Sequence, residues 1–140
     1  MITLEQAKTM VSVARAKGRE MGLKPLSVAV LDAGGHLLAF EREDGASPGR
    51  FEIARGKAYG AVMLGMPGSA LMARAEDQGY FMAAMNGAFG GKVVPVPGGV
   101  LVKDAAGAVI GAVGVTGDTS DNDAAAAVAG IAAAGLTPVA

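Results

Sequence analysis

Apolar residues recur at helical spacing in some stretches of the chain and at strand spacing in others. Thr3 followed three residues later by Gln6 has the form of a capping box, which begins the first helical stretch. Gly65 and Pro67 end the second helical stretch. The spacing predicts helices over residues 4–21, 50–64, 69–76, 80–86 and 120–134.

Strand spacing is found on both sides of the central helices. The strand-like segments before these helices flank a turn at 32–35, and those after them flank a turn at 104–107. The predicted strands are residues 26–31, 36–41, 93–96, 99–103 and 108–116. Strand pairs without an intervening helix indicate antiparallel pairing. We therefore expect an α/β protein of the α+β type, with a central antiparallel sheet of about five strands flanked by helices.

Composition narrows the class of protein. The length of 140 residues suits a single domain over 1–140, and 22 glycines allow its elements to pack closely. Lys and Arg total 12 against 13 Asp and Glu, without a run of one sign, so no nucleic-acid partner is expected. The absence of cysteine excludes disulfides and thiolate metal sites. Because no signal peptide or long apolar run is found, we expect a cytoplasmic protein with no membrane partner.

Lys57 is the most informative single residue. A helical wheel of 50–64 places it in the middle of the apolar face, and Arg50 lies on the same face. An ammonium group that points at a core needs an anion or a lowered pKa, because unpaired burial is very costly. Lys57 is therefore either a clamp for a ligand anion or a poised acid–base group, or else it forms an internal ion pair or extends to the surface.

A second group of polar residues lies where the strand 108–116 meets the last helix. Ser120 followed by Asp123 is a plausible capping pair for that helix. Backbone N–H groups at such a junction can bind an anion, but the nearby aspartates disfavour phosphate. They favour a hydroxyl or amine ligand, or a proton-transfer role for Asp118 or Asp123.

Other residues give weaker signals. Gly98 and Gly99 let backbones approach one another or a flat ligand, but no Rossmann or P-loop motif surrounds them. His36 is the single histidine and follows a turn, so a structural role is favoured over a metal site. We expect no protein-built metal site.

Four motifs in order resemble the GlcG/HbpS family, also called the haem-degrading domain family. They are followed by Asp123 and by Ala129-Gly130, and together they extend over essentially the whole chain. The motifs are Val30–Gly35, Ile53–Ala58, Val96–Val100 and Gly111–Gly117. The resemblance implies a profilin-like fold and, commonly, a homo-oligomer.

The resemblance implies several functions. Members are associated with haem or corrinoid binding, with redox sensing, and with operons for small organic acids or aromatic ring-cleavage products. The segments 43–45, 57–60 and 117–123 look most like the branch found beside aromatic-degradation genes. Tetrapyrrole-binding relatives use a histidine, and residues 4–21 of this chain contain none. That departure counts against haem, although Met or Thr can also hold it.

The sequence thus favours a catabolic enzyme or accessory protein that acts on a small anionic metabolite, such as a ring-cleavage semialdehyde or a hydroxy acid. Lys57, Asp123 and Asp118 are its candidate catalytic residues. The candidate ligand-binding residues are Arg50, Phe51, Lys57, Gly98, Gly99, Thr116 and Gly117. The alternative is a non-catalytic module that binds haem or a corrinoid, including a redox sensor.

Overall fold

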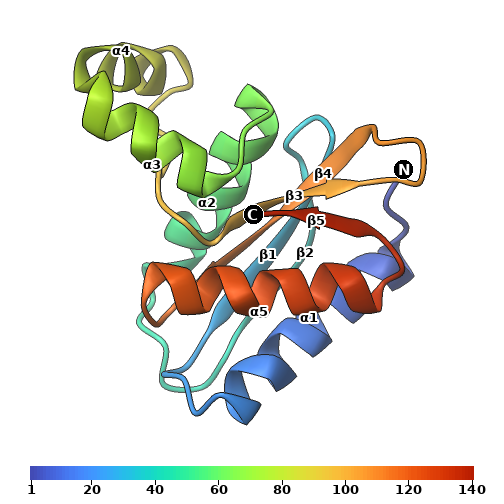
Figure 1. Ribbon diagram of the computed structural model, residues 1–140. Helices are drawn as coiled ribbons and strands as arrows, with labels where there is room; N and C mark the ends of the chain where they lie inside the picture. The colour runs from blue at the N-terminus through green and yellow to red at the C-terminus, as the bar shows by residue number, and fades with distance from the viewer.

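A computed structural model describes residues 1–140 as one antiparallel sheet with helices on both faces (Figure 1). The strands lie in the order β2-β1-β4-β3-β5. They are β1 (Ser27–Asp32), β2 (Leu37–Arg42), β3 (Gly99–Lys103), β4 (Val109–Thr116) and β5 (Thr137–Val139). The helices are α1 (Leu4–Glu20), α2 (Arg50–Leu64), α3 (Gly68–Asp77), α4 (Gly79–Ala88) and α5 (Ser120–Ala133). The expected α+β fold with five antiparallel strands is confirmed.

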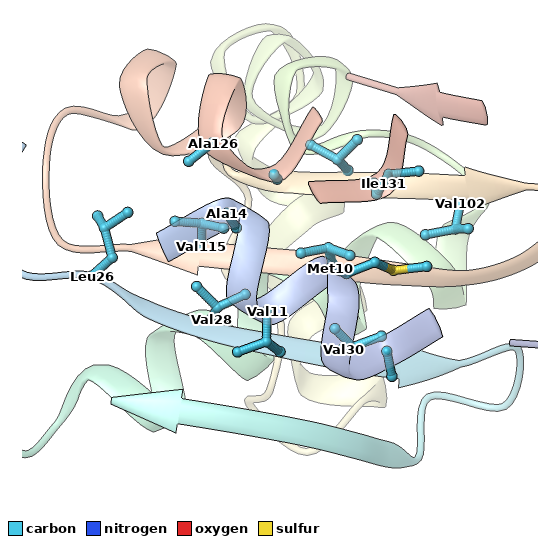
Figure 2. Close-up of a cluster of buried hydrophobic side chains, with 14 of the residues drawn as sticks. Met10, Val11, Ala14, Leu26, Val28, Val30, Val102, Val115, Ala126 and Ile131 are labelled. Atoms are coloured by element: carbon cyan, nitrogen blue, oxygen red, sulfur yellow. The ribbon is translucent and has the colours of Figure 1, made fainter. Parts of the chain in front are cut away.

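Helices α1 and α5 lie side by side on one face of the sheet, and α2 covers the other face (Figure 1). Successive strand residues point to opposite faces, so Val28 and Val30 of β1 meet α1 and α5, whereas Leu31 meets α2. Figure 2 shows the larger cluster, in which Met10 and Ile131 fill the space between the helices and the sheet. Helix α3 contacts α2 and begins beside β3, and α4 packs against α3 farther from the sheet (Figure 1).

Glycine brings α2 directly onto the centre of the sheet. A Cβ atom added to Gly114 of β4 would lie 1.9 Å from the carbonyl oxygen of Ala54. A Cβ atom added to Gly99 of β3 would lie 2.3 Å from the carbonyl oxygen of Lys57. No side chain fits at either position, so the α2 backbone rests on the strands, and the first turns of α2 are fixed beside the ends of β3 and β4.

Two details of the predicted strands are wrong. Residues 93–96 form no strand: the segment lies along α2, where the N–H of Val94 donates to the carbonyl of Gly56 at 3.1 Å. The periodicity of β-branched residues cannot distinguish that contact from a sheet contact. The strand β5, which the pattern missed, pairs with the edge of β3 through Leu101 and Val139. It is short and contains Pro138, which is tolerated because the strand lies at an edge.

No helix in this structure combines the length and the apolar character needed to span a bilayer.

Candidate functional site

Lys57 crosses from one helical layer towards the other. Its side chain leaves α2 and passes Gly98, where an added Cβ atom would lie 2.9 Å from Nζ. Nζ donates to the carbonyl oxygen of Val115 at 2.9 Å and to Oδ2 of Asp123 in α5 at 3.1 Å. The side chain of Lys57 is 4% exposed and that of Asp123 is 1% exposed. The lysine is therefore held in a buried ion pair that joins α2 to α5 at the end of the sheet.

Opposing effects within the protein act on the pKa of the buried lysine. Burial lowers the pKa of Lys57, the charge and hydrogen bond of Asp123 oppose that shift, and the charge of Arg50 adds to it. The second carboxylate oxygen of Asp123 accepts the N–H of Asp118 at 3.0 Å. Of the alternatives that the sequence left open for Lys57, the internal ion pair is present. The catalytic roles of Lys57 and Asp123 stay predictions.

The loop before α5 is organised by Asp118. Its carboxylate accepts the N–H of Thr119 at 2.9 Å, the side-chain amide of Asn122 at 2.9 Å and the N–H of Lys24 at 3.1 Å. These donors, the amide of Asn122 first, lower the pKa of Asp118 to about 2. The expected capping role of Ser120 is wrong, because Thr119 is the N-cap and accepts the N–H of Asn122. The carboxylate of Asp123, proposed as the partner in that cap, is instead used by Lys57.

Arg50 begins α2 and lies beside the end of β4. Its Nη1 donates to Oγ1 of Thr116 at 2.9 Å, and its Nε donates to Oγ of Ser47 at 3.2 Å. Together with Lys24 and Gly117 it lines a hollow of about 230 Å³, called here the Arg50 hollow. The complete lining is Lys24, Pro25, Gly45, Ala46, Ser47, Arg50 and Gly117.

The other predicted ligand-binding residues lie elsewhere. Gly98 and Gly99 line a separate hollow of about 170 Å³, which also contains Ser69 and Asp121. Phe51 packs edge to face against Phe40 of β2, with their ring centres 4.8 Å apart. The fold therefore brings Arg50, Thr116 and Gly117 together, but it places Phe51 and the glycine pair outside that group.

A third hollow, at the end of the β1–β2 hairpin, has no counterpart in the sequence analysis. We call it the hairpin hollow; its volume is about 470 Å³ and its lining is mostly apolar. The fold creates it by placing the N-terminal residues beside the hairpin turn and β4, which are far apart in the sequence. Its lining consists of Met1, Ile2, Asp32, Ala33, Gly34, Leu38 and Ile110.

His36 lies against this hairpin hollow. A Cβ atom added to Gly34 would be 2.8 Å from Cε1 of the imidazole, so the ring covers that residue of the lining. Nδ1 is 3.3 Å from Oδ1 of Asp32, and the histidine side chain is 81% exposed. Asp32 also accepts the N–H groups of His36 and Gly34, each at 2.9 Å, and these bonds lower its pKa. The imidazole thus lies beside a carboxylate that backbone N–H groups hold in place.

A groove of about 550 Å³ runs between α1 and β2 and is called the α1–β2 groove. It offers the hydroxyls of Thr9 and Ser12 and the ammonium of Lys8, but no histidine or methionine. The ring of Phe40, one of its lining residues, packs towards Phe51 of α2. No cluster of three or more His, Cys, Asp or Glu side chains suited to a metal ion is present in residues 1–140.

The fold and these hollows define a class of small α+β domains, and comparison with known proteins identifies the family. Residues 2–132 match the family model described as haem degrading protein HbpS-like. The chain is 36% identical to protein GlcG of Escherichia coli K12 over 118 residues, which are 79% of this chain and 80% of GlcG. It is 34% identical to a 15.0 kDa protein from the dhaT-dhaS intergenic region of Citrobacter freundii, covering 87% and 84% of the two chains. The chain belongs to the HbpS-like family.

Solved structures agree with this assignment. A double mutant of HbpS from Streptomyces reticuli superposes with a TM-score of 0.79 at 32% identity, covering 93% of this chain and 84% of that one. The structure of a PduOC–haem complex superposes with a TM-score of 0.86 at 23% identity, covering 99% and 98%. At that identity the second likeness concerns the fold alone. The expected membership of the GlcG/HbpS family is confirmed.

Proposed function

We propose that this chain is a haem-binding module in which His36 supplies an axial ligand and the hairpin hollow receives one edge of the macrocycle. The family description, haem degrading protein HbpS-like, supports haem as the ligand class. The observation that carries the proposal is the pairing of His36 with Asp32 beside Gly34, where Asp32 and Gly34 line a mostly apolar hollow. This choice departs from the sequence-based preference for a catabolic enzyme.

The residues fit the requirements of haem. The macrocycle brings its own equatorial ligands, so the protein needs only an axial donor and no cluster of metal ligands. Histidines that bind metals usually give their other ring nitrogen to a carboxylate, which fixes the tautomer, and Asp32 is placed to do so. At about 470 Å³ the hairpin hollow lies in the range of roughly 300–1,000 Å³ that is typical of ligand pockets. Bound haem would supply an iron centre for redox or gas-ligand chemistry.

His36 gives this chain a histidine for haem binding, although it lies outside the first helix. The first helix contains none, which weighed against haem when only the sequence was considered. The tertiary structure provides the donor from the hairpin turn instead, next to the start of α1. The α1–β2 groove is larger, but it offers hydroxyls, the ammonium of Lys8 and the carboxylate of Glu41, which is paired with Arg15, so it fits an axial role less well.

The test is a haem titration followed by absorption spectroscopy. Wild-type protein is expected to give a saturable Soret shift. His36→Ala should change the band and weaken binding strongly, and Asp32→Asn should weaken it by about 10–100-fold, as loss of an orienting partner typically does. Ser12→Leu, which fills the α1–β2 groove, is the matched control and should bind as wild type does.

Two results would overturn the proposal. The absence of a saturable shift in wild type would exclude haem as the ligand. A normal spectrum for His36→Ala combined with lost binding in Ser12→Leu would place the haem in the α1–β2 groove and remove His36 from the site. The thermal unfolding midpoint of each variant is measured first, so that a folding defect is not taken for a binding defect.

One part of the catabolic-enzyme hypothesis, the binding of an anion by Arg50, still has support in this structure. Lys57 and Asp123 neutralise each other in the core and line none of the hollows, so they give it no direct support. Arg50, in contrast, faces a hollow. Binding of a small anionic metabolite at Arg50 is therefore the second candidate function, and proton transfer by Asp118 remains a part of it that has yet to be tested.

A further inference from the structure

Two cationic side chains face the Arg50 hollow without a carboxylate partner. Arg50 and Lys24 both line it, and no Asp or Glu oxygen lies within 4.0 Å of either charged group. Several other surface cations of this chain do have such partners, as Arg15 has with Glu41 and Glu43. The hollow is therefore lined by two cationic residues, neither of which forms a salt bridge within the chain.

The guanidinium of Arg50 is held in a fixed plane. The hydroxyl of Thr116, a residue only 1% exposed, accepts from Nη1, and the hydroxyl of Ser47 accepts from Nε. Both anchors are neutral, so they orient the group without cancelling its charge. Nη2 takes part in no hydrogen bond within the chain and stays available. A guanidinium that is held in one plane and has free N–H donors is suited to binding a planar carboxylate.

The surroundings of the hollow also favour an anion. Gly49 is the N-cap of α2 and provides no side chain to cap it, so the positive end of the helix opens beside Arg50. Asp118, which follows the lining residue Gly117, accepts three N–H groups, one of them from the backbone of Lys24. These bonds hold the carboxylate in the loop that carries Gly117, and its charge also attracts Lys24.

We propose that the Arg50 hollow binds a small carboxylate, with Arg50 as the principal contact and Lys24 as the second cation. The hollow, about 230 Å³ in volume, is smaller than the roughly 300 Å³ at which pockets for drug-sized ligands begin. It therefore suits an acid of a few carbons and excludes a tetrapyrrole. The inference rests on the second candidate function and is independent of haem binding at His36.

The experiment is a calorimetric titration of the full chain with glycolate, malonate and succinate, with inorganic phosphate as a separate arm. At least one of the three acids should bind saturably, and added salt should weaken it. Arg50→Met should weaken that binding by at least about tenfold, since one charged hydrogen-bonding partner is lost. Lys24→Met should weaken it less. Lys103→Met removes a cation outside the hollow and should leave the affinity unchanged.

A second measurement uses the wild-type protein alone and so does not depend on the stability of the variants. Amide chemical shifts of the wild type, recorded with the acid that binds most tightly, should move at residues 45–50 and at Gly117 but not at Gly34 or His36. His36→Ala should bind the acid as wild type does, so failure of the haem proposal leaves this one intact. No saturable heat with any acid, unchanged affinity in Arg50→Met, or tighter binding of phosphate than of every carboxylate would each overturn the proposal.

Discussion

The buried ion pair allows a quantitative test of what holds the two helical layers together. Asp123→Ala leaves the Lys57 ammonium in a position where its side chain is 4% exposed and Val115 provides the only acceptor within hydrogen-bonding distance. Lys57→Met leaves the Asp123 carboxylate, 1% exposed, with only the N–H of Asp118. Removing one partner of a buried pair typically costs about 3–5 kcal/mol. That is a large part of the roughly 5–15 kcal/mol by which native proteins are stable.

The double variant separates the ion pair from ordinary packing. With both charges removed, the remaining penalty comes from the Val115 carbonyl and the Asp118 N–H, each of which loses a partner at about 1–3 kcal/mol. The double variant Lys57→Met/Asp123→Ala should therefore be destabilised by about 3 kcal/mol less than the sum of the single variants. For a chain of this size, each single variant should lower the unfolding midpoint by roughly 10 °C.

The assay is urea unfolding followed by far-UV circular dichroism, which reports the helices, with thermal unfolding as a second measure. Additive effects of the two substitutions would refute the inference that the side chains stabilise each other. So would a loss below about 1 kcal/mol in either single variant, which would be typical of an exposed pair. If Lys57→Met abolished ligand binding without changing stability, Lys57 would instead be a clamp for a ligand anion.

Two further predictions follow from the packing and the loop. Gly114→Ala should cost about 2–3 kcal/mol in urea unfolding because its Cβ atom would meet the carbonyl of Ala54, whereas Gly87→Ala in α4, with nothing within 4 Å, should be neutral or slightly stabilising. The pKa of Asp118 is lowered from 3.8 to about 2, so its contribution to stability is present above pH 3.8 and is lost as pH falls towards 2. In midpoints recorded against pH, Asp118→Asn should flatten the decline over that window; an unchanged profile would contradict the assignment.

The sequence predicts most of the fold because each successful element carries its own local signal. The capping box of Thr3 and Gln6 is present as predicted, and the helical wheel correctly buries Lys57 on the inner face of α2. The two strand errors concern segments whose partners lie far away in the chain. Residues 93–96 have a strand-like pattern but lie against α2, and β5 exists only because the edge of β3 is free to pair with it.

The candidate sites also combine features that local sequence patterns predict with features that depend on contacts between distant segments. Periodicity alone shows that Lys57 faces the core, but whether its partner is Asp123 or a ligand depends on a contact between residues 66 positions apart, which no local pattern encodes. The pairing of His36 with Asp32 is local, four residues apart, yet the hollow beside it is also lined by Met1 and Ile2, which lie far away in the chain. Local patterns in the sequence predict the five helices, four of the five strands, the antiparallel pairing and the family. The tertiary structure alone decided which charges neutralise each other and which, like Arg50 and Lys24, are left facing open space, because charge compensation depends on distances that are set only when the layers pack.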